Sequence, residues 1–125
     1  MDINIPTIVA EVTDAFQRYE AALVNNDVKT LDSLFWTSEH VIRYGQTENL
    51  HGDKEILAFR QSRPSKGLER SLRKTVITTF GHDFATANTE FTKPGQHRVG
   101  RQSHSWARLE NRWQIVAAHV SWMDE

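Results

Sequence analysis

Two polar side chains occupy positions where the sequence pattern calls for apolar residues, and both could act on a small anion. Arg43 shares one face of a predicted strand, residues 41–44, with Val41, because alternate residues of a strand point the same way. An arginine among apolar strand residues is seldom buried without an anionic partner. That partner is either a carboxylate of a ligand or a carboxylate of the chain, for which the candidates are Glu20, Asp32 and Glu90.

Tyr19 belongs to the apolar stripe of a predicted N-terminal helix. The stripe recurs at three- and four-residue steps, as a helix face turned to the core does, and consists of Val9, Val12, Phe16, Tyr19 and Leu23. A buried tyrosine often ties its hydroxyl to a backbone group. The same hydroxyl in a pocket can deliver or relay a proton. The sequence leaves both interpretations open.

A β-hairpin is predicted for residues 100–122, with its turn at Glu110-Asn111-Arg112, since Asn tolerates the positive φ of a tight turn. Alternation along the second strand puts one set of side chains on a single face: Trp113, Ile115, Ala117, His119 and Ser121. This face begins apolar and ends polar, which indicates core at one end and a pocket wall at the other. His119 and Ser121 are therefore predicted to face a ligand, although a hydrogen-bonded core histidine is an equal alternative.

Three further residues are weaker candidates for binding a substrate. Arg101 opens the hairpin and shares a face with Ser103, while Arg73 precedes an earlier strand. A guanidinium can bind a carboxylate bidentately, where an ammonium offers only a point charge. These residues, together with His119 and Ser121, form the predicted substrate-binding set around Tyr19 and Arg43.

The order of the predicted elements indicates an α+β fold in a single domain, residues 1–125. A helix begins at Pro6, and a second is capped by Asp27. After the strand at 41–44 comes a polar turn region, Gly45 to Leu50, and a third helix that begins near Gly52. Two strands, 74–80 and 84–92, then lead to the final hairpin. Helices early and an antiparallel meander late are typical of α+β proteins.

Composition excludes several functional classes. A formal net charge of -1 gives no general attraction to nucleic acid or to an acidic membrane surface,, and no apolar run is long enough to span a bilayer. The basic stretch from Arg60 to Lys74 lacks interleaved aromatics and is interpreted as a solvated loop with a few cations turned inward,. The six histidines are scattered and the chain has no cysteine, so neither a metal nor a cofactor is expected. A cytoplasmic location fits the missing cysteines.

Several motifs resemble those of a known superfamily. The segments LFW, VIRYG, HGDKEILAFR and RWQIVAAHVS are similar to the SnoaL-like branch of the nuclear transport factor 2-like superfamily. That resemblance covers essentially the whole chain and implies a curved sheet wrapped against the long first helix around a conical pocket. It also implies a homodimer formed through the convex face of the sheet, where the late strands carry apolar residues on both sides.

A narrower set of motifs, RYEAAL, VIRYG, FRQSRP, GRQSHSW and WQIVAAHVS, resembles the AtzH-like family. The resemblance implies a decarboxylating amidohydrolase that converts urea-1,3-dicarboxylate to allophanate in cyanuric acid catabolism, a branch of nitrogen metabolism, with a functional link to an amidase. The functional residues of that family fall here on Tyr19 and Arg43. Two other roles remain open: a non-catalytic small-acid binder or amidase partner, and a proton-transfer isomerase, which would need a carboxylate base in the pocket.

Overall fold

The computed structural model describes residues 1–124, and its elements follow the order that the sequence predicts, with one additional strand. Three helices, α1 (Pro6–Val24), α2 (Val28–Leu34) and α3 (Asp53–Ser62), accompany a single sheet. Its strands are β1 (Ile42–Tyr44), β2 (Asn49–His51), β3 (Ser71–Phe80), β4 (Phe84–Thr92), β5 (Gly100–Leu109) and β6 (Arg112–Trp122). The predicted α+β class is confirmed.

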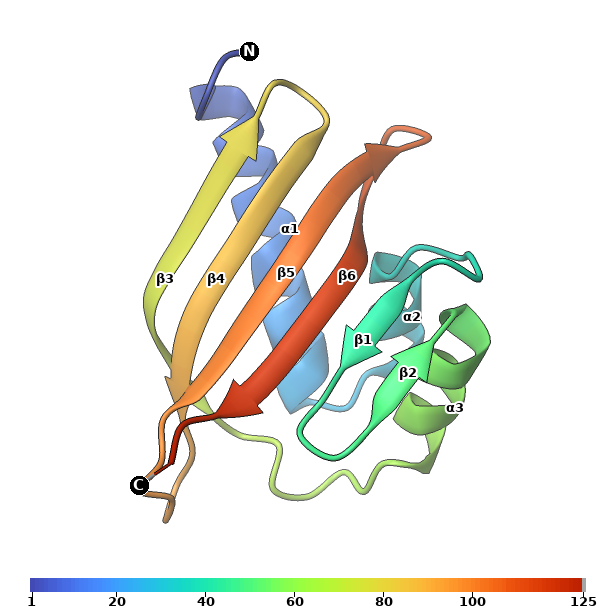
Figure 1. Ribbon diagram of the computed structural model, residues 1–125, viewed down its shortest axis with the longest axis vertical. Coiled ribbons are helices and arrows are strands. Elements are labelled where there is room, and N and C mark those ends of the chain that lie inside the picture. Colours follow the sequence, from blue (N-terminus) through green and yellow to red (C-terminus); the bar gives the residue numbers. More distant parts are fainter. Residues whose placement is uncertain (125) are drawn as a thin grey trace.

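The sheet is curved and unclosed, with the strand order β2-β1-β6-β5-β4-β3. Neighbouring strands are antiparallel except β1 and β6, which run parallel. Helix α1 crosses one face of the long strands, while α2 and α3 gather beside the short β1–β2 pair (Figure 1). We call the face of the sheet that packs on α1 the inner face, and the opposite face the outer face.

Helix α1 presents a buried stripe to the inner face because its apolar residues recur with helical spacing. The stripe consists of Ile8, Val12, Ala15, Phe16, Tyr19, Ala22 and Leu23, while Val9 is only half-buried. Pro6 occupies the first turn, where its missing N–H is not needed,. The side chain of Asp27 caps α2 by accepting a hydrogen bond from the Thr30 amide at 3.2 Å,. Both predicted helix starts are confirmed.

Small residues in β4 let α1 approach the sheet closely. Ala85 and Ala87 are fully buried on the inner face, next to Trp106 of β5 and Ile115 of β6. The β5–β6 hairpin closes through Glu110 and Asn111, both with positive φ, as the sequence predicts for its turn,. The core therefore sits between α1 and the middle of the sheet, and the polar inner residues lie toward one end of it.

A β-bulge in β6 reverses the faces that simple alternation predicts for the end of this strand. Ser105 pairs with Ala117, but the next residue of β5 pairs with Ile115, which leaves Val116 as an extra residue,. Beyond the bulge, Ala118 is buried on the inner face while His119 is exposed. The prediction that His119 continues the face of Ile115 is therefore wrong.

Two boundary predictions are also corrected. The predicted turn region Gly45 to Leu50 contains the start of β2, which pairs with β1 so that Arg43 lies opposite Leu50. Strand β3 begins at Ser71, so Arg73 lies inside the strand rather than before it. Three-residue strands such as β2 are missed because they are too short to show an alternating pattern.

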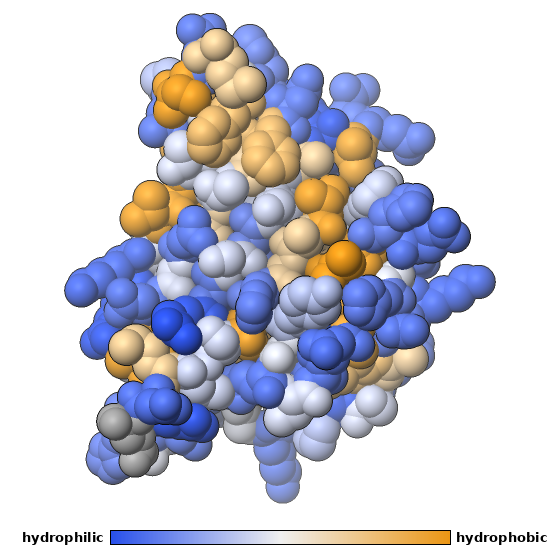
Figure 2. All heavy atoms as spheres, viewed as in Figure 1, coloured by the Kyte–Doolittle hydropathy of each residue, from blue (hydrophilic) through white to orange (hydrophobic). Residues whose placement is uncertain are grey.

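The outer face carries apolar residues at one end and polar residues at the other. Figure 2 shows hydrophobic atoms over the upper part of the sheet and hydrophilic atoms lower down. The exposed side chains include Val76 and Phe84, and the Phe84 ring contacts Phe80 with centroids 6.2 Å apart. Among the described residues, no helix is both long and apolar enough to cross a membrane.

We propose that a second copy of the chain covers this outer face, and we expect a dimeric mass in light scattering at micromolar concentration. Phe84→Asp should give a monomer, because an exposed apolar patch would then carry a charge,. Lys54→Glu on the exposed side of α3 is the control and should leave the mass unchanged. A monomeric mass for the unmodified protein would contradict the prediction.

Candidate functional site

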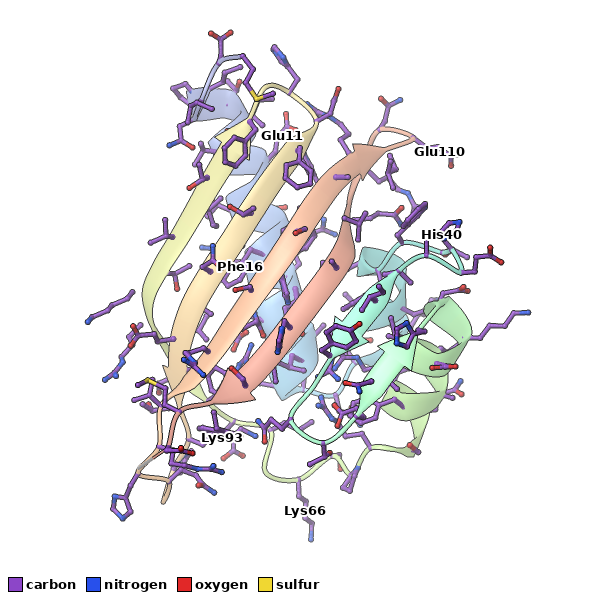
Figure 3. All side chains as sticks on the ribbon, in the orientation of Figure 1. Glu11, Phe16, His40, Lys66, Lys93 and Glu110 are labelled. Atoms are coloured by element: carbon purple, nitrogen blue, oxygen red, sulfur yellow. The ribbon has the colours of Figure 1, made fainter. Side chains whose placement is uncertain are left out.

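A cavity of about 390 Å³ opens at one end of the molecule, between β1, the C-terminus of α3 and the loop that follows it. It narrows inward through two smaller hollows, and all three spaces share Arg43 and Val120 in their walls. Lys66 and Lys93 lie at this end, while Glu11 and Glu110 lie at the opposite end (Figure 3). The floor of the narrow part is formed by Tyr19, Gln102 and His104.

Tyr19 reaches this floor from the buried stripe of α1 and is only 2% exposed. Its ring meets the edge of His104, with centroids 4.6 Å apart. Arg60 Nη2, from the last turn of α3, lies 3.4 Å from the Tyr19 hydroxyl oxygen. The hydroxyl therefore faces a guanidinium rather than the backbone group that a purely structural tyrosine often uses.

Arg43 is held on the cavity wall by the β1–β2 turn. Its Nη1 donates to Glu48 Oε1 at 2.8 Å, and its guanidinium lies 4.9 Å from the centroid of the Phe59 ring. A side chain at Gly45 would collide with the Glu48 carboxylate, so the glycine makes room for this ion pair. The carboxylate partner is thus Glu48, and none of the three acids proposed from the sequence.

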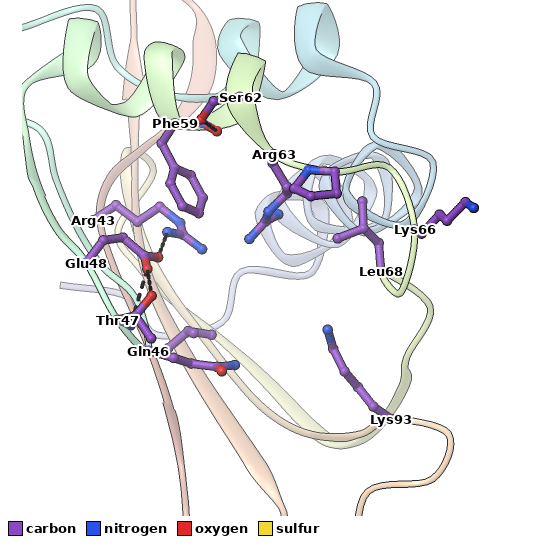
Figure 4. Close-up of a pocket in the computed structure, with 12 residues that line it drawn as sticks. Arg43, Gln46, Thr47, Glu48, Phe59, Ser62, Arg63, Lys66, Leu68 and Lys93 are labelled. Carbon is purple, nitrogen blue, oxygen red and sulfur yellow. Dashed lines mark hydrogen bonds and ion pairs between the residues drawn. The ribbon is translucent and has the colours of Figure 1, made fainter.

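Arg63 and Lys93 stand at the wider part of the cavity with no carboxylate partner among residues 1–124. Arg63 also packs against the Phe59 ring, with its guanidinium 4.9 Å from the ring centroid. Figure 4 shows Arg43, Arg63 and Lys93 pointing toward the same space. Burial lowers the pKa of Arg63 to about 10, and the neighbouring charges of Arg60 and Arg43 add to this effect,.

Arg70 and Gln102 complete the inner wall of the cavity. Arg70 makes a bidentate ion pair with Glu20, at 2.8 Å and 2.6 Å, and its Nη2 also donates to Gln102 Oε1 at 2.8 Å. Gln102 is 3% exposed. The Glu20 carboxylate thereby fixes Arg70, and Arg70 in turn fixes the amide of Gln102.

The cations around Tyr19 control its ionisation. Burial alone would raise the pKa of Tyr19, but the positive charges of Arg60, Arg43 and Arg70 outweigh it and hold the pKa below the ordinary value of 10.0,. Burial lowers the pKa of Arg60, and the neighbouring Arg43 and Arg70 add to this effect. The site is therefore arranged to stabilise negative charge, either on Tyr19 or on a ligand beside it.

Most of the predicted substrate-binding set lies on the outer face, away from this cavity. Cross-strand pairing places Arg101 opposite Ser121 and Ser103 opposite His119 on that face, and Arg73 bonds to Glu90 there at 3.0 Å. The structure thus brings Tyr19 and Arg43 to one cavity, while Arg73, Arg101, Ser103 and Ser121 do not line it. His119 borders the innermost hollow, although the residue is exposed. The bulge at Val116 explains why His119 and Ser121 do not share the face of Ile115.

Sequence reasoning missed most of the cationic residues in the cavity wall and behind it. Arg60, Arg63 and Arg70 belong to the basic stretch that was interpreted as a loop with a few cations turned inward, and the structure turns these three inward. Gln102 does not belong to the predicted set, which contains its neighbours Arg101 and Ser103 on the opposite face of the strand. The sequence does carry a signal for Gln102, because alternation places this polar residue on the same strand face as His104 and Trp106,.

Comparison with known proteins identifies the family of this chain. The profile of the AtzH-like family matches residues 1–125. The chain belongs to the AtzH-like family. None of the curated proteins that were compared matches it.

Solved structures with the same fold support this assignment. A protein of unknown function from the DUF3225 family of Pectobacterium atrosepticum is 56% identical, with a TM-score of 0.97 over 98% of this chain and 96% of that chain. A cystatin-like fold protein from Burkholderia xenovorans is 46% identical, with a TM-score of 0.95 over 100% and 98% of the two chains. A nuclear transport factor 2-like superfamily protein from Salmonella enterica, 23% identical with a TM-score of 0.77 over 95% and 93%, shares the fold. The fold that the resemblance implies is confirmed.

The buried His104 should make this AtzH-like protein sensitive to acid. Burial, and then Arg70, Arg60 and Arg43, hold the pKa of His104 well below its ordinary 6.5. At pH values between this folded-state pKa and 6.5, the unfolded chain binds a proton at His104 that the folded chain does not bind. The contribution of His104 to the free energy of unfolding is therefore fully present above pH 6.5 and is lost as the pH falls toward the folded-state pKa,. The loss from this residue amounts to about 1.4 kcal/mol of unfolding free energy per pH unit at most.

Denaturant unfolding at several pH values between neutrality and about pH 5 would measure this slope. His104→Gln should lower the number of protons taken up on unfolding by about one, which flattens the slope of unfolding free energy against pH. His97→Gln, in an exposed turn, should leave this slope unchanged. An unchanged slope in His104→Gln would contradict the placement of a neutral histidine under Tyr19.

Proposed function

We propose that this AtzH-like protein binds a small carboxylated urea in the cavity and decarboxylates it, converting urea-1,3-dicarboxylate to allophanate. The observation that carries the proposal is the excess of cations at the cavity and behind Tyr19. Arg43 and Arg70 each have a carboxylate partner, but Arg60, Arg63 and Lys93 have none among residues 1–124. A dianion entering the cavity would meet Arg63 and Lys93, and its charge would also act on Arg60, which lies behind the Tyr19 hydroxyl,.

Arg43 is suited to hold the carboxylate that leaves. Its guanidinium lines the cavity at every depth, and the ion pair with Glu48 occupies only Nη1. A planar guanidinium binds a carboxylate through two parallel N–H groups, which fixes the orientation as well as the position of the ligand. The reacting end of the ligand would then lie beside the Tyr19 hydroxyl.

Tyr19 is suited to supply the proton that the reaction consumes. In the proposed step, the bond between the urea nitrogen and the carboxylate carbon breaks, carbon dioxide leaves, and its bonding electrons stay with the nitrogen. The phenol O–H transfers its proton to that nitrogen, giving allophanate and a tyrosinate, which water then reprotonates. The lowered pKa of Tyr19 supports this role, because Arg60, Arg43 and Arg70 stabilise the tyrosinate despite its burial,.

The alternative of a proton-transfer isomerase is not favoured by the residues that line the cavity. Glu48 is the carboxylate on the described part of its wall. Burial opposes its ionisation, but hydrogen bonds from Thr47 and Arg43 outweigh this effect and lower its pKa. A carboxylate so well satisfied is a poor proton acceptor. A non-catalytic small-acid binder or amidase partner would use the same cations and is distinguished by the absence of turnover.

Tyr19→Phe should leave ligand binding and the fold largely intact while carbon dioxide release from urea-1,3-dicarboxylate falls about 100-fold or more, because the proton donor is lost. Arg43→Lys should keep the charge but lose the bidentate contact, weakening ligand binding by about 1.5–3 kcal/mol. Both variants are to be assayed for carbon dioxide release per folded molecule, with thermal melts recorded in parallel.

Tyr44→Phe is the matched control. Tyr44 also borders the innermost hollow, but its ring packs on His51 and His119 and its hydroxyl takes no part in the proposed step. This variant should retain activity. If Tyr19→Phe instead melted well below the unmodified protein while its activity per folded molecule stayed unchanged, Tyr19 would be a structural residue and the catalytic proposal would fail.

A further inference from the structure

Gln102 places an unpaired hydrogen-bond donor on the floor of the cavity. Its side chain is 3% exposed and lines the two inner hollows together with Tyr19 and Arg43. Its Nε2 has no hydrogen-bond partner among the described residues. A buried donor without an acceptor is destabilising, and a ligand that brings an acceptor to this point would remove that cost.

The orientation of this amide is set by its neighbour. Arg70 Nη2 donates to Gln102 Oε1 at 2.8 Å, and a guanidinium can only donate, so the oxygen of the amide must be the atom that faces Arg70. Arg70 cannot turn away, because Glu20 holds it at 2.8 Å and 2.6 Å. The Nε2 hydrogens are therefore left for a ligand.

The chemistry of the site indicates which ligand atom this donor meets. The nitrogen that Tyr19 would protonate carries two substituents, the departing carboxylate and the central carbonyl of the urea. Arg43 is suited to the carboxylate, because charged pairs make the stronger hydrogen bonds. Gln102 is neutral and lines the same hollow as Tyr19 and Arg43. The acceptor that remains for its Nε2 is the carbonyl oxygen of the urea. As carbon dioxide leaves, negative charge spreads onto that oxygen, where a fixed donor is most effective.

We propose that Gln102 Nε2 donates a hydrogen bond to the central carbonyl oxygen of the ligand, so that the site selects small dicarboxylates with a carbonyl between their two carboxylates. The inference rests on the proposed function for the identity of the ligand. It assigns to Gln102, which touches the substrate, a catalytic role that Tyr19 and Arg43 do not cover.

Two probes of equal length isolate the carbonyl: 3-oxoglutarate, freshly dissolved, and glutarate, which has a methylene in its place. Calorimetric titration should show 3-oxoglutarate binding roughly tenfold more tightly to the unmodified protein, the effect of one hydrogen bond. Gln102→Leu should bring the affinity ratio to about one, since its side chain offers no donor.

Two further variants keep the test decisive. Gln102→Glu retains an acceptor for Arg70 and so protects the fold, and should also abolish the preference, with both affinities lowered by repulsion. Gln114→Leu changes a buried glutamine whose amide bonds to Ser33 outside the cavity, and should keep the preference.

Equal affinities of the unmodified protein for the two probes, no binding of either, or a preference that survives in Gln102→Leu would each overturn the inference. Failure of the proposed function has a different signature. In that case urea-1,3-dicarboxylate would release no carbon dioxide above the uncatalysed rate, whatever the ratio of the two affinities.

Discussion

The contact between the Arg60 guanidinium and the Tyr19 hydroxyl, buried between α1 and α3, is the interaction on which the rest of the site depends. Arg60 is 1% exposed, and its Nε and Nη1 have no partner among the described residues. A buried guanidinium without a carboxylate is costly. The contacts of Arg60 with the Tyr19 hydroxyl and with the Phe35 ring, whose centroid lies 5.5 Å away, offset part of that cost. That cost is what makes the cavity attract anions.

Much of the fold was predictable because long, periodic segments dominate it. The α1 stripe and the β5–β6 hairpin each carry a pattern over many residues, and both have the bounds that their patterns indicate. Strand β2 could not be predicted, because Asn49–His51 is too short for a pattern and forms through its pairing with β1. Tertiary contacts decide such elements, not local preference.

The site was predictable only in part, for a related reason. Arg43 and Tyr19 stand out as polar residues on apolar faces, and that contrast survives in the structure as a shared cavity. The face of His119 could not be predicted, because one extra residue at Val116 reverses alternation and no sequence rule locates the bulge,. The burial of Arg60 could not be predicted either, since a cation in the last turn of a helix is ordinarily solvated,.

Direct titration of Tyr19 is the most direct test of this account. The chain has two tyrosines, so Tyr44→Phe leaves Tyr19 as the sole phenol, and its ionisation can be followed by ultraviolet absorbance against pH. We expect a pKa below 10.0 in Tyr44→Phe and a higher pKa once Arg60→Met is added, because burial then acts with less opposing charge. A Tyr19 that ionises only above 10.0, or is unaffected by Arg60→Met, would contradict the claim that buried arginines prepare it to give up a proton.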